Sequence, residues 1–200
     1  MLRKIIKILM QKFQSQMSKW NNFKFHLLLW VAGINGKGVN TCKGCPIVDI
    51  KEGAKVEFGE NIWLNNYHNT AWYTRCMIHV GGNAHLRIGD NTGCNGVLLF
   101  CNESISIGSH VLIGGGTRIY DTNFHELDWH IRRDPSQKGE VKTAPVVIGD
   151  DTFVGTGCII GKGVHIGERS IIAAGSVVVK DIPSDCIAGG NPCKVIKMLA

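Results

Sequence analysis

The stretch VIGDDTFVGTGCIIGKGVHIGERSIIAAGSVVVKDIP, residues 147–183, places a branched aliphatic residue at every sixth position. The six residues are Ile148, Val154, Ile160, Ile166, Ile172 and Val178, and Gly or Ala follows each of the first five. An amphipathic helix repeats its apolar residues every three or four positions, and a half-buried strand repeats them every two. A strict period of six fits neither pattern, so the stretch indicates a repeat architecture.

Self-similarity at six residues is typical of a β-helix, in which each hexapeptide forms a short strand and a turn and three of them close a triangular coil. We expect the aliphatic residue to point inward, together with the smaller residue two positions before it. Those smaller residues are Thr152, Cys158, Val164, Ser170 and Ser176. Coils stack only on their neighbours, so the two ends of the stack need covers.

The composition is that of one globular domain with a basic N-terminal segment. Hydrophobic residues make up 44% of the 200 residues and charged residues 19%, which excludes a disordered chain. Eight basic residues and no acidic one precede Asp49, whereas the remainder carries 14 basic and 16 acidic residues. The basic character therefore belongs to the N-terminal segment, and the domain itself has no recognised nucleic-acid motif.

Residues 1–30 are predicted to form a basic amphipathic helix, helical up to about Trp20. Apolar residues recur there at spacings of three and four, at Leu2, Ile5, Ile6, Leu9, Phe13, Met17 and Trp20. Two interpretations stay open: the helix caps the repeat stack, or it lies on an anionic membrane surface. The run HLLLWVA is too short to span a bilayer, and no signal peptide is recognised. We therefore expect a cytoplasmic protein, at most in contact with the inner face of a membrane.

The remaining residues, 31–200, are predicted to form the β-helix domain. The six-residue pattern is broken in residues 33–124, is interrupted by a polar loop at 120–145, and returns cleanly at 146–181. A short helix is expected at the C-terminus. Cys94, Cys158 and Cys186 fall within or beside the apolar pattern and are interpreted as small buried residues in a reducing compartment. Cys42 and Cys45 have the spacing of half a zinc site, but no second CxxC completes it, so no metal is expected.

Three segments together resemble a known family: the repeat itself, AGGNPCKVI at 188–196, and YDTNFHELD at 120–128. They are similar to the hexapeptide-repeat acyltransferases, in particular to maltose and galactoside O-acetyltransferases and to the acetyltransferases of capsule and exopolysaccharide pathways. The resemblance covers most of residues 50–197. It implies an all-β, left-handed parallel β-helix, a homotrimer, acetyl-CoA as the acyl donor, and a saccharide or glycan precursor as the acceptor.

Acyl transfer needs a base, donors for the developing oxyanion, and close placement of two substrates. The resemblance implies that His125, at the start of the loop, is the general base. Asp128 is the favoured orienting partner, while Asp121, Glu126 or a backbone carbonyl stay open. Trp129 and Arg132, which follow in the loop, suit a sugar ring and its anionic substituents.

The resemblance assigns the other site residues by position. It implies oxyanion donation from the backbone of Gly155 and Thr156. Asn95 is a further candidate, although Cys94 occupies the register where the sugar acetyltransferases carry an asparagine. Asn102 matches a position that contacts the acceptor. The positions implied for binding CoA are Phe153, Gly155, Ala173, Ala174, Lys180 and Lys194, the two lysines for its phosphates.

Alternatives to O-acetylation stay open. Acetylation of an amino sugar would use the same site. His125 and His130, with His110 as a third ligand, would fit a zinc-dependent, carbonic-anhydrase-like β-helix enzyme. A non-catalytic scaffold shares the fold as well. The histidine pair lies in the loop rather than on consecutive strands, and a zinc enzyme would not need the segment GGNPCKVI, so both observations disfavour the zinc enzyme. The joint presence of His125, Lys180 and Lys194 disfavours a non-catalytic scaffold.

Overall fold

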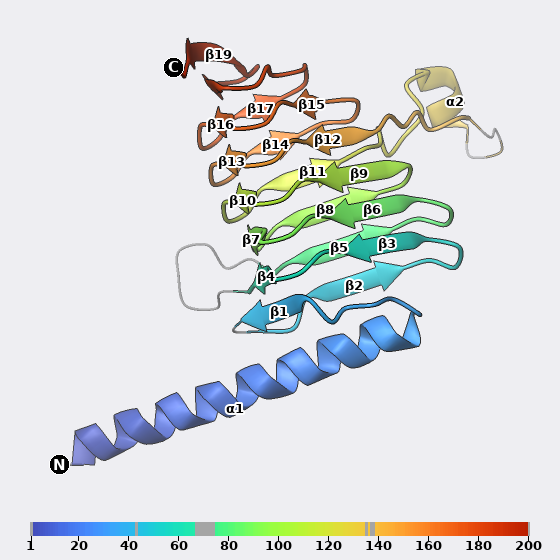
Figure 1. Ribbon diagram of the computed structural model, residues 1–200. Coiled ribbons are helices and arrows are strands. Elements are labelled where there is room, and N and C mark those ends of the chain that lie inside the picture. Colours follow the sequence, from blue (N-terminus) through green and yellow to red (C-terminus); the bar gives the residue numbers. More distant parts are fainter. Residues whose placement is uncertain (1, 43, 67–74, 135, 137–138, 200) are drawn as a thin grey trace.

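Short strands build a three-sided prism in which each side is one sheet (Figure 1). The computed structural model describes residues 2–42, 44–66, 75–134, 136 and 139–199. Successive strands move from sheet A to sheet B to sheet C and back, and neighbouring coils pair in parallel. The predicted parallel β-helix is confirmed.

Within the described residues, sheet A has eight strands, sheet B six and sheet C five. Sheet A contains β1 (Val39–Cys42), β4 (Ile62–Asn65), β7 (Gly93–Asn95), β10 (Leu112–Ile113), β13 (Phe153–Val154), β16 (Ile171–Ile172), β18 (Cys186–Gly189) and β19 (Lys194–Met198). Sheet B contains β2 (Ile47–Ile50), β5 (Met77–Val80), β8 (Leu98–Cys101), β11 (Arg118–Tyr120), β14 (Ile159–Ile160) and β17 (Val177–Val178). Sheet C contains β3 (Lys55–Phe58), β6 (His85–Ile88), β9 (Ser104–Ile107), β12 (Val146–Ile148) and β15 (His165–Ile166).

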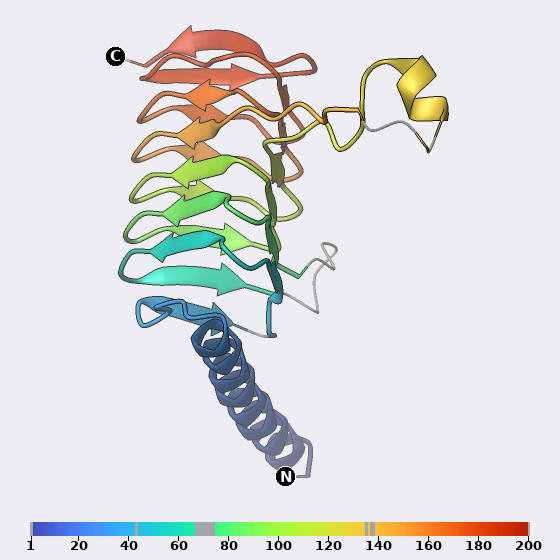
Figure 2. The ribbon, with the colours of Figure 1, turned by 90° about the vertical axis from the view of Figure 1, so that its right-hand side faces the viewer.

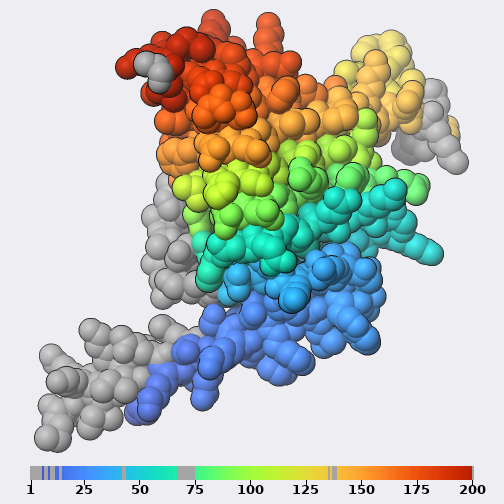
Figure 3. All heavy atoms as spheres, in the orientation of Figure 1, coloured from blue at the N-terminus to red at the C-terminus, as the bar shows by residue number. Residues whose placement is uncertain are grey.

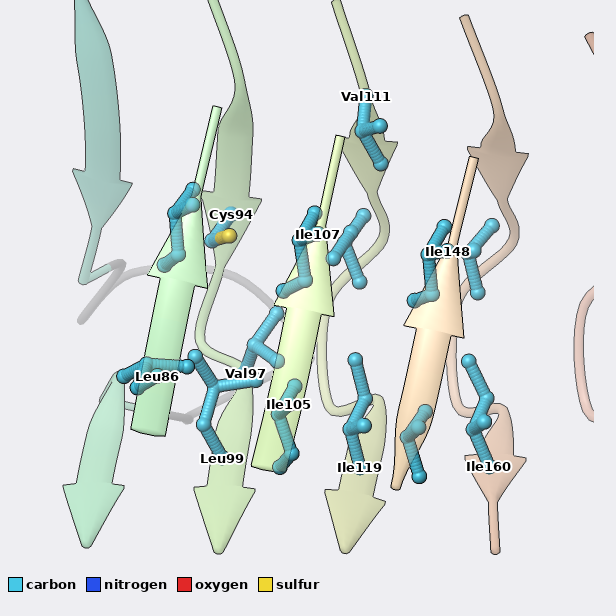
Figure 4. Packing of buried hydrophobic residues seen from close by; sticks show 14 of the residues in the cluster. Leu86, Cys94, Val97, Leu99, Ile105, Ile107, Val111, Ile119, Ile148 and Ile160 are labelled. Atoms are coloured by element: carbon cyan, nitrogen blue, oxygen red, sulfur yellow. The ribbon is translucent and has the colours of Figure 1, made fainter. Parts of the chain in front are cut away.

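The core is the column of inward-pointing side chains between the three sheets, part of which Figure 4 shows. All six residues of the period, and all five of the smaller residues before them, are buried. The buried hydroxyls find backbone partners, because Thr152 Oγ1 donates to the carbonyl of Gly167 and Ser170 Oγ to that of Pro183. Cys94, Cys158 and Cys186 are buried free thiols, as predicted.

The glycine that follows the aliphatic residue has a steric reason in three of the coils, at Gly149, Gly155 and Gly167. A Cβ placed on Gly155 would lie 2.5 Å from the backbone nitrogen of Ala174 in the next coil, and one on Gly149 would lie 2.5 Å from that of Glu168. The turns of successive coils therefore stack too closely for most side chains. This close approach, rather than an unusual φ, explains glycine at these positions.

Both ends of the prism are covered, but not wholly as expected. The N-terminal helix α1 spans Leu2–Val31, well beyond Trp20, because its C-terminal half packs under β1 with Phe25 and Leu29 buried. The side chains of Leu2, Ile5 and Cys42 lie outside the described part of the structure. The expected C-terminal helix is wrong: β18 adds to β16, and β19 then turns back to pair antiparallel with β18.

A long excursion, residues 121–145 and hereafter the arm, leaves the prism between β11 of sheet B and β12 of sheet C. It carries one short helix, α2 (Trp129–Arg133), and extends sideways from the prism (Figure 2). Tyr120 still belongs to β11, so the excursion begins one residue later than the predicted loop.

Candidate active site

The arm is fixed to the prism by a buried carboxylate at its first residue. Asp121 is fully buried and accepts hydrogen bonds from the backbone N–H groups of three consecutive residues, two in the turn between β8 and β9 and the third at the start of β9. The distances are 2.8 Å from Asn102 N to Oδ1, 2.7 Å from Glu103 N to Oδ2, and 2.8 Å from Ser104 N to Oδ2. Charge-assisted bonds to backbone N–H groups are among the strong ones, so Asp121 ties the root of the arm to the coil below.

The outgoing and returning segments of the arm pair with each other. Ala144 N donates to the carbonyl of Asp121, and Asn123 N donates to that of Lys142, at 2.9 and 3.1 Å. Thr122 and Thr143 form an antiparallel bridge between these bonds. The arm therefore starts as a two-stranded stem, and His125 follows this stem after two residues.

An aromatic cluster clamps the residue just before His125. Phe124 has a φ of 63°, a conformation that is an outlier for a bulky side chain. Its ring packs edge-on against Phe100 and Tyr120, with ring centroids 4.8 and 5.3 Å apart. Phe100 in turn stacks on His79 at 4.1 Å, and Asp49 holds His79 Nδ1 at 2.8 Å. Tertiary contacts hold the strained backbone of Phe124 in place. They therefore also restrain the backbone of His125, the next residue.

His125 itself is exposed, and its ring has no hydrogen-bond partner in the described part of the chain. The three acids proposed to orient it have other partners. Asp121 binds the β8–β9 turn, and Glu126 Oε1 accepts from the backbone N–H groups of Leu127 and Asp128. Asp128 caps α2 and accepts from the backbone and the ring of His130, which lowers the pKa of its carboxyl group. Pairing of Asp128 with His125 stays a prediction.

The tip of the arm carries the residues predicted to contact the acceptor. The Trp129 ring stacks on the ring of His130, with centroids 3.5 Å apart. The guanidinium of Arg133 lies over the Trp129 ring, 5.3 Å from its centroid. Arg132 Nη1 donates to the carbonyls of Glu126 and Leu127, so this guanidinium also holds the arm together. Trp129 and Arg132 thus lie on the same excursion as His125.

A second group of predicted residues lies along the edge where sheet A turns into sheet B. The register of β7, β10, β13 and β16 stacks Asn95, Gly114, Gly155 and Ala173 in one column, because each follows a paired residue. Thr156 and Ala174 come next in their coils, and Phe153 lies on the outer face of sheet A, about half exposed. Six predicted site residues therefore meet on one edge: Asn95, Phe153, Gly155, Thr156, Ala173 and Ala174.

The two predicted oxyanion donors differ in their availability. Gly155 N donates to the carbonyl of Ile172 at 2.8 Å and so belongs to the ladder between coils. Thr156 N donates to no atom of the described residues. Asn95 accepts a hydrogen bond at Oδ1 from Asn65 Nδ2. Of the two backbone groups, the N–H of Thr156 is therefore the free donor.

These two groups lie at different corners of one copy of the chain. The arm leaves the corner between sheets B and C, on the right of Figure 1, whereas the strands of sheet A lie on the left. Figure 3 shows the arm protruding clear of the prism. Asn102 is in the turn bound by Asp121 and so lies by the arm, while the exposed Lys180 and Lys194 follow β17 and open β19 at the C-terminal end. The structure thus divides the predicted site into two parts.

Comparison with known proteins assigns the chain to a family. The bacterial transferase hexapeptide (six repeats) model matches residues 145–180. The galactoside O-acetyltransferase of Escherichia coli is 34% identical over 140 residues, which are 70% of this chain and 62% of that enzyme. A maltose O-acetyltransferase of Clostridium difficile, of known structure, is 32% identical, with 76% of this chain and 71% of that one covered and a TM-score of 0.45. The chain belongs to the hexapeptide-repeat acetyltransferases.

A further hexapeptide-repeat acetyltransferase shares the fold over nearly the whole chain. The structure of the Vibrio cholerae protein VCA0836, solved with acetyl-CoA, is 27% identical, covers 95% of this chain and 88% of that one, and has a TM-score of 0.56. The chain spans less than two thirds of the length of the first curated relatives it matches.

One feature of this hexapeptide-repeat acetyltransferase was not predicted from sequence. The outer face of sheet B carries an apolar groove of about 580 Å³ beside the edge where sheets A and B meet. Its lining residues are Ile47, Arg75, Met77, Gly96, Leu98, Gly116, Thr117, Arg118, Gly157 and Ile159. Gly116 and Gly157 have φ values of 72° and 68°, and a Cβ on either would meet no atom within 4 Å. Turn glycines therefore keep this edge open.

The described residues hold neither a metal site nor a membrane-spanning helix. No three His, Cys, Asp or Glu side chains gather there as a metal site requires. None of the helices in that part of the chain has the length and apolar content needed to cross a bilayer.

Proposed function

We propose that this protein transfers the acetyl group of acetyl-CoA to a hydroxyl group of a saccharide or of a surface-polysaccharide precursor. The observation that carries the proposal is the arm, a fixed excursion that presents an exposed imidazole, His125, without a partner among the described residues. Excursions on a rigid scaffold commonly carry function. Membership of the acetyltransferase family supports the donor, and the Vibrio relative was solved with acetyl-CoA.

In the proposed reaction His125 is the general base. Its neutral imidazole takes the proton of the acceptor hydroxyl while the hydroxyl oxygen attacks the thioester carbonyl carbon. The N–H of Thr156 donates to the oxygen that becomes negative. The tetrahedral adduct then expels the thiolate of CoA, which takes the proton from the imidazolium, so the products are an acetyl ester and free CoA. Asp128 is the proposed orienting partner of the imidazole.

We infer a homotrimer, because one subunit alone holds the two parts of the site at different corners. A second copy that brings its sheet A edge to the arm would complete the site, and a threefold ring closes such a head-to-tail contact. The apolar groove on sheet B supports this inference, since an exposed apolar patch next to such an edge is typical of an interface.

Each of the two groups of residues has a proposed substrate. We propose that the pantetheine arm of CoA lies along the edge formed by Gly155, Ala173 and Ala174, where small side chains permit close approach, with Phe153 as an apolar wall. Lys180 and Lys194, exposed at the C-terminal end, would pair with its phosphates. Asn95, Asn102, Trp129 and Arg132 would contact the saccharide.

We place the enzyme in the cytoplasm, at the inner face of the membrane, within polysaccharide biosynthesis. The seven cysteines whose side chains the structure describes support a reducing compartment, because all seven are free thiols.

The test is release of CoA from acetyl-CoA with a panel of galactosides, glucosides, amino sugars and glycan precursors. We expect turnover with hydroxyl acceptors, and a loss of about 100-fold or more in His125→Ala, because general base catalysis contributes that much. His165→Ala, which removes an exposed histidine of sheet C, is the matched control and should keep full activity. Light scattering should give a trimer for all three proteins. Unchanged turnover in His125→Ala would refute the assigned base, and preference for amino sugars would replace O-transfer by N-transfer.

A further inference from the structure

Helix α1 carries an apolar stripe that nothing in the described chain covers. Its described members are all exposed, and Phe13 and Trp20 each keep 64% of their surface. We call this set the outer stripe: Ile6, Leu9, Phe13, Met17, Trp20, Phe23, Leu27, Trp30 and Val31. Figure 1 shows that most of the helix extends away from the prism. So many large apolar side chains on one exposed element mark an interaction surface.

The outer stripe faces away from the prism. Phe25 and Leu29 are buried against the first coil, and Asn22 Oδ1 accepts from both the N–H and the hydroxyl of Thr41. Leu27 lies two residues from Phe25 and from Leu29, and two residues correspond to about 200° around a helix. Trp20 and Phe13 lie one and two heptads before Leu27 and so share its face to within about 20° per heptad. One face of α1 therefore caps the prism while the opposite face is free.

The charges beside the outer stripe select its partner. Lys12, Lys19 and Lys24 are exposed on the same helix, and no acidic residue occurs before Asp49. A second copy of α1 would bring lysine against lysine, with no acid to form the interhelical pairs that stabilise coiled coils. An anionic lipid surface offers the complementary charge, and Trp, Phe and Leu on one face with Lys at its borders is the pattern of an interfacial helix.

We propose that α1 binds an anionic membrane surface, with the outer stripe at the boundary between headgroups and acyl chains. This inference names the segment that would hold the enzyme at the membrane location proposed above. Its biological purpose rests on the proposed function, but lipid binding itself does not require catalysis. The geometry keeps the site accessible. The arm leaves the fourth coil, and coils lie about 4.8 Å apart, so it stands roughly 14 Å above the first coil along the prism.

The experiment is co-sedimentation of the full chain with vesicles of phosphatidylglycerol and phosphatidylcholine, compared with vesicles of phosphatidylcholine alone. We expect the partition coefficient to be at least about tenfold higher on the anionic vesicles and to fall with added salt. Phe13→Ser/Trp20→Ser should lower it at least about tenfold, because binding scales with the buried apolar area. Lys12→Glu/Lys19→Glu should remove the preference for anionic vesicles.

Matched controls come from the other end of the prism. Ile196 and Lys197 are exposed on β19, and Ile196→Ser and Lys197→Glu should partition like the unchanged protein. Equal binding of Phe13→Ser/Trp20→Ser and the unchanged protein would overturn the proposal. So would a change in assembly mass in that variant without a change in vesicle binding, because the outer stripe would then join copies of the chain. CoA release measured on the same preparations separates the two proposals: an inactive protein that still binds vesicles refutes the enzymatic function alone.

Discussion

The ring of Phe124 packs edge-on against the ring of Phe100, with centroids 4.8 Å apart, and this contact joins the arm to the face of sheet B. Phe124 pays a conformational cost there, since its φ of 63° is strained for any residue with a large side chain. The residue after it is His125. The contact between the arm and sheet B therefore helps to determine the position of His125, the proposed base.

Removing this contact should affect turnover more than binding. We expect Phe124→Gly, which tolerates the φ but lacks the ring, to lower kcat about tenfold or more because His125 is less well placed. KM for acetyl-CoA should change little, and Phe124→Tyr should restore kcat because it keeps the ring. Steady-state kinetics with thermal unfolding of the same samples checks this. An unaltered kcat in Phe124→Gly would show that the clamp does not position the base.

Asp121 should be important for stability. Asp121→Ala leaves three partly buried N–H groups, at Asn102, Glu103 and Ser104, without their acceptor, so we expect a loss of about 3 kcal/mol in the free energy of unfolding. For a chain of this size that corresponds to a fall in Tm of roughly 10 °C. Differential scanning calorimetry gives the value. Asp181→Ala is the comparison, since this exposed carboxylate accepts a single bond, from His165 N, and its loss should lower Tm far less.

The buried thiols should be unreactive in the folded protein. Burial raises the pKa of Cys76 to about 11, and burial with the nearby Asp121 charge raises that of Cys101 to about 12. Thiolate is the reactive form, so at pH 8 about one in a thousand Cys76 side chains would carry it. Peptide mapping after iodoacetamide treatment should find both residues unmodified in the native protein and labelled in guanidinium. Labelling of native Cys76 at the rate of a free thiol would contradict the burial.

Part of the site followed from sequence and part did not. His125 was recognised from its place in the YDTNFHELD segment, and the structure puts it on a fixed excursion. The sequence did not predict the row of residues that holds Phe124 in place, which is formed by Asp49, His79 and Phe100. Successive members of this row lie 30 and 21 residues apart in sequence. Coils of unequal length hide such neighbours from any fixed period.

The structures of the two ends of the chain also depend on contacts that the local sequence does not reveal. Residues 21–31 of α1 are helical because Phe25 and Leu29 pack on the first coil, a contact that lies outside the helical segment itself. The C-terminal tail forms β19 rather than a helix because β18 leaves an open edge that a returning strand can pair with. Neither fact is contained in the local sequence.

The amino-acid sequence by itself determined the repeat and the inward face of each coil from residue 147 to 183. A six-residue period assigns the aliphatic side chain at each sixth position to the core without reference to the rest of the chain. Only the tertiary structure decided which outward residues become neighbours, which carboxylate holds the arm, and which face of α1 stays free. Those relationships depend on how coils stack and on what packs against their ends, and such contacts join residues that are distant in sequence.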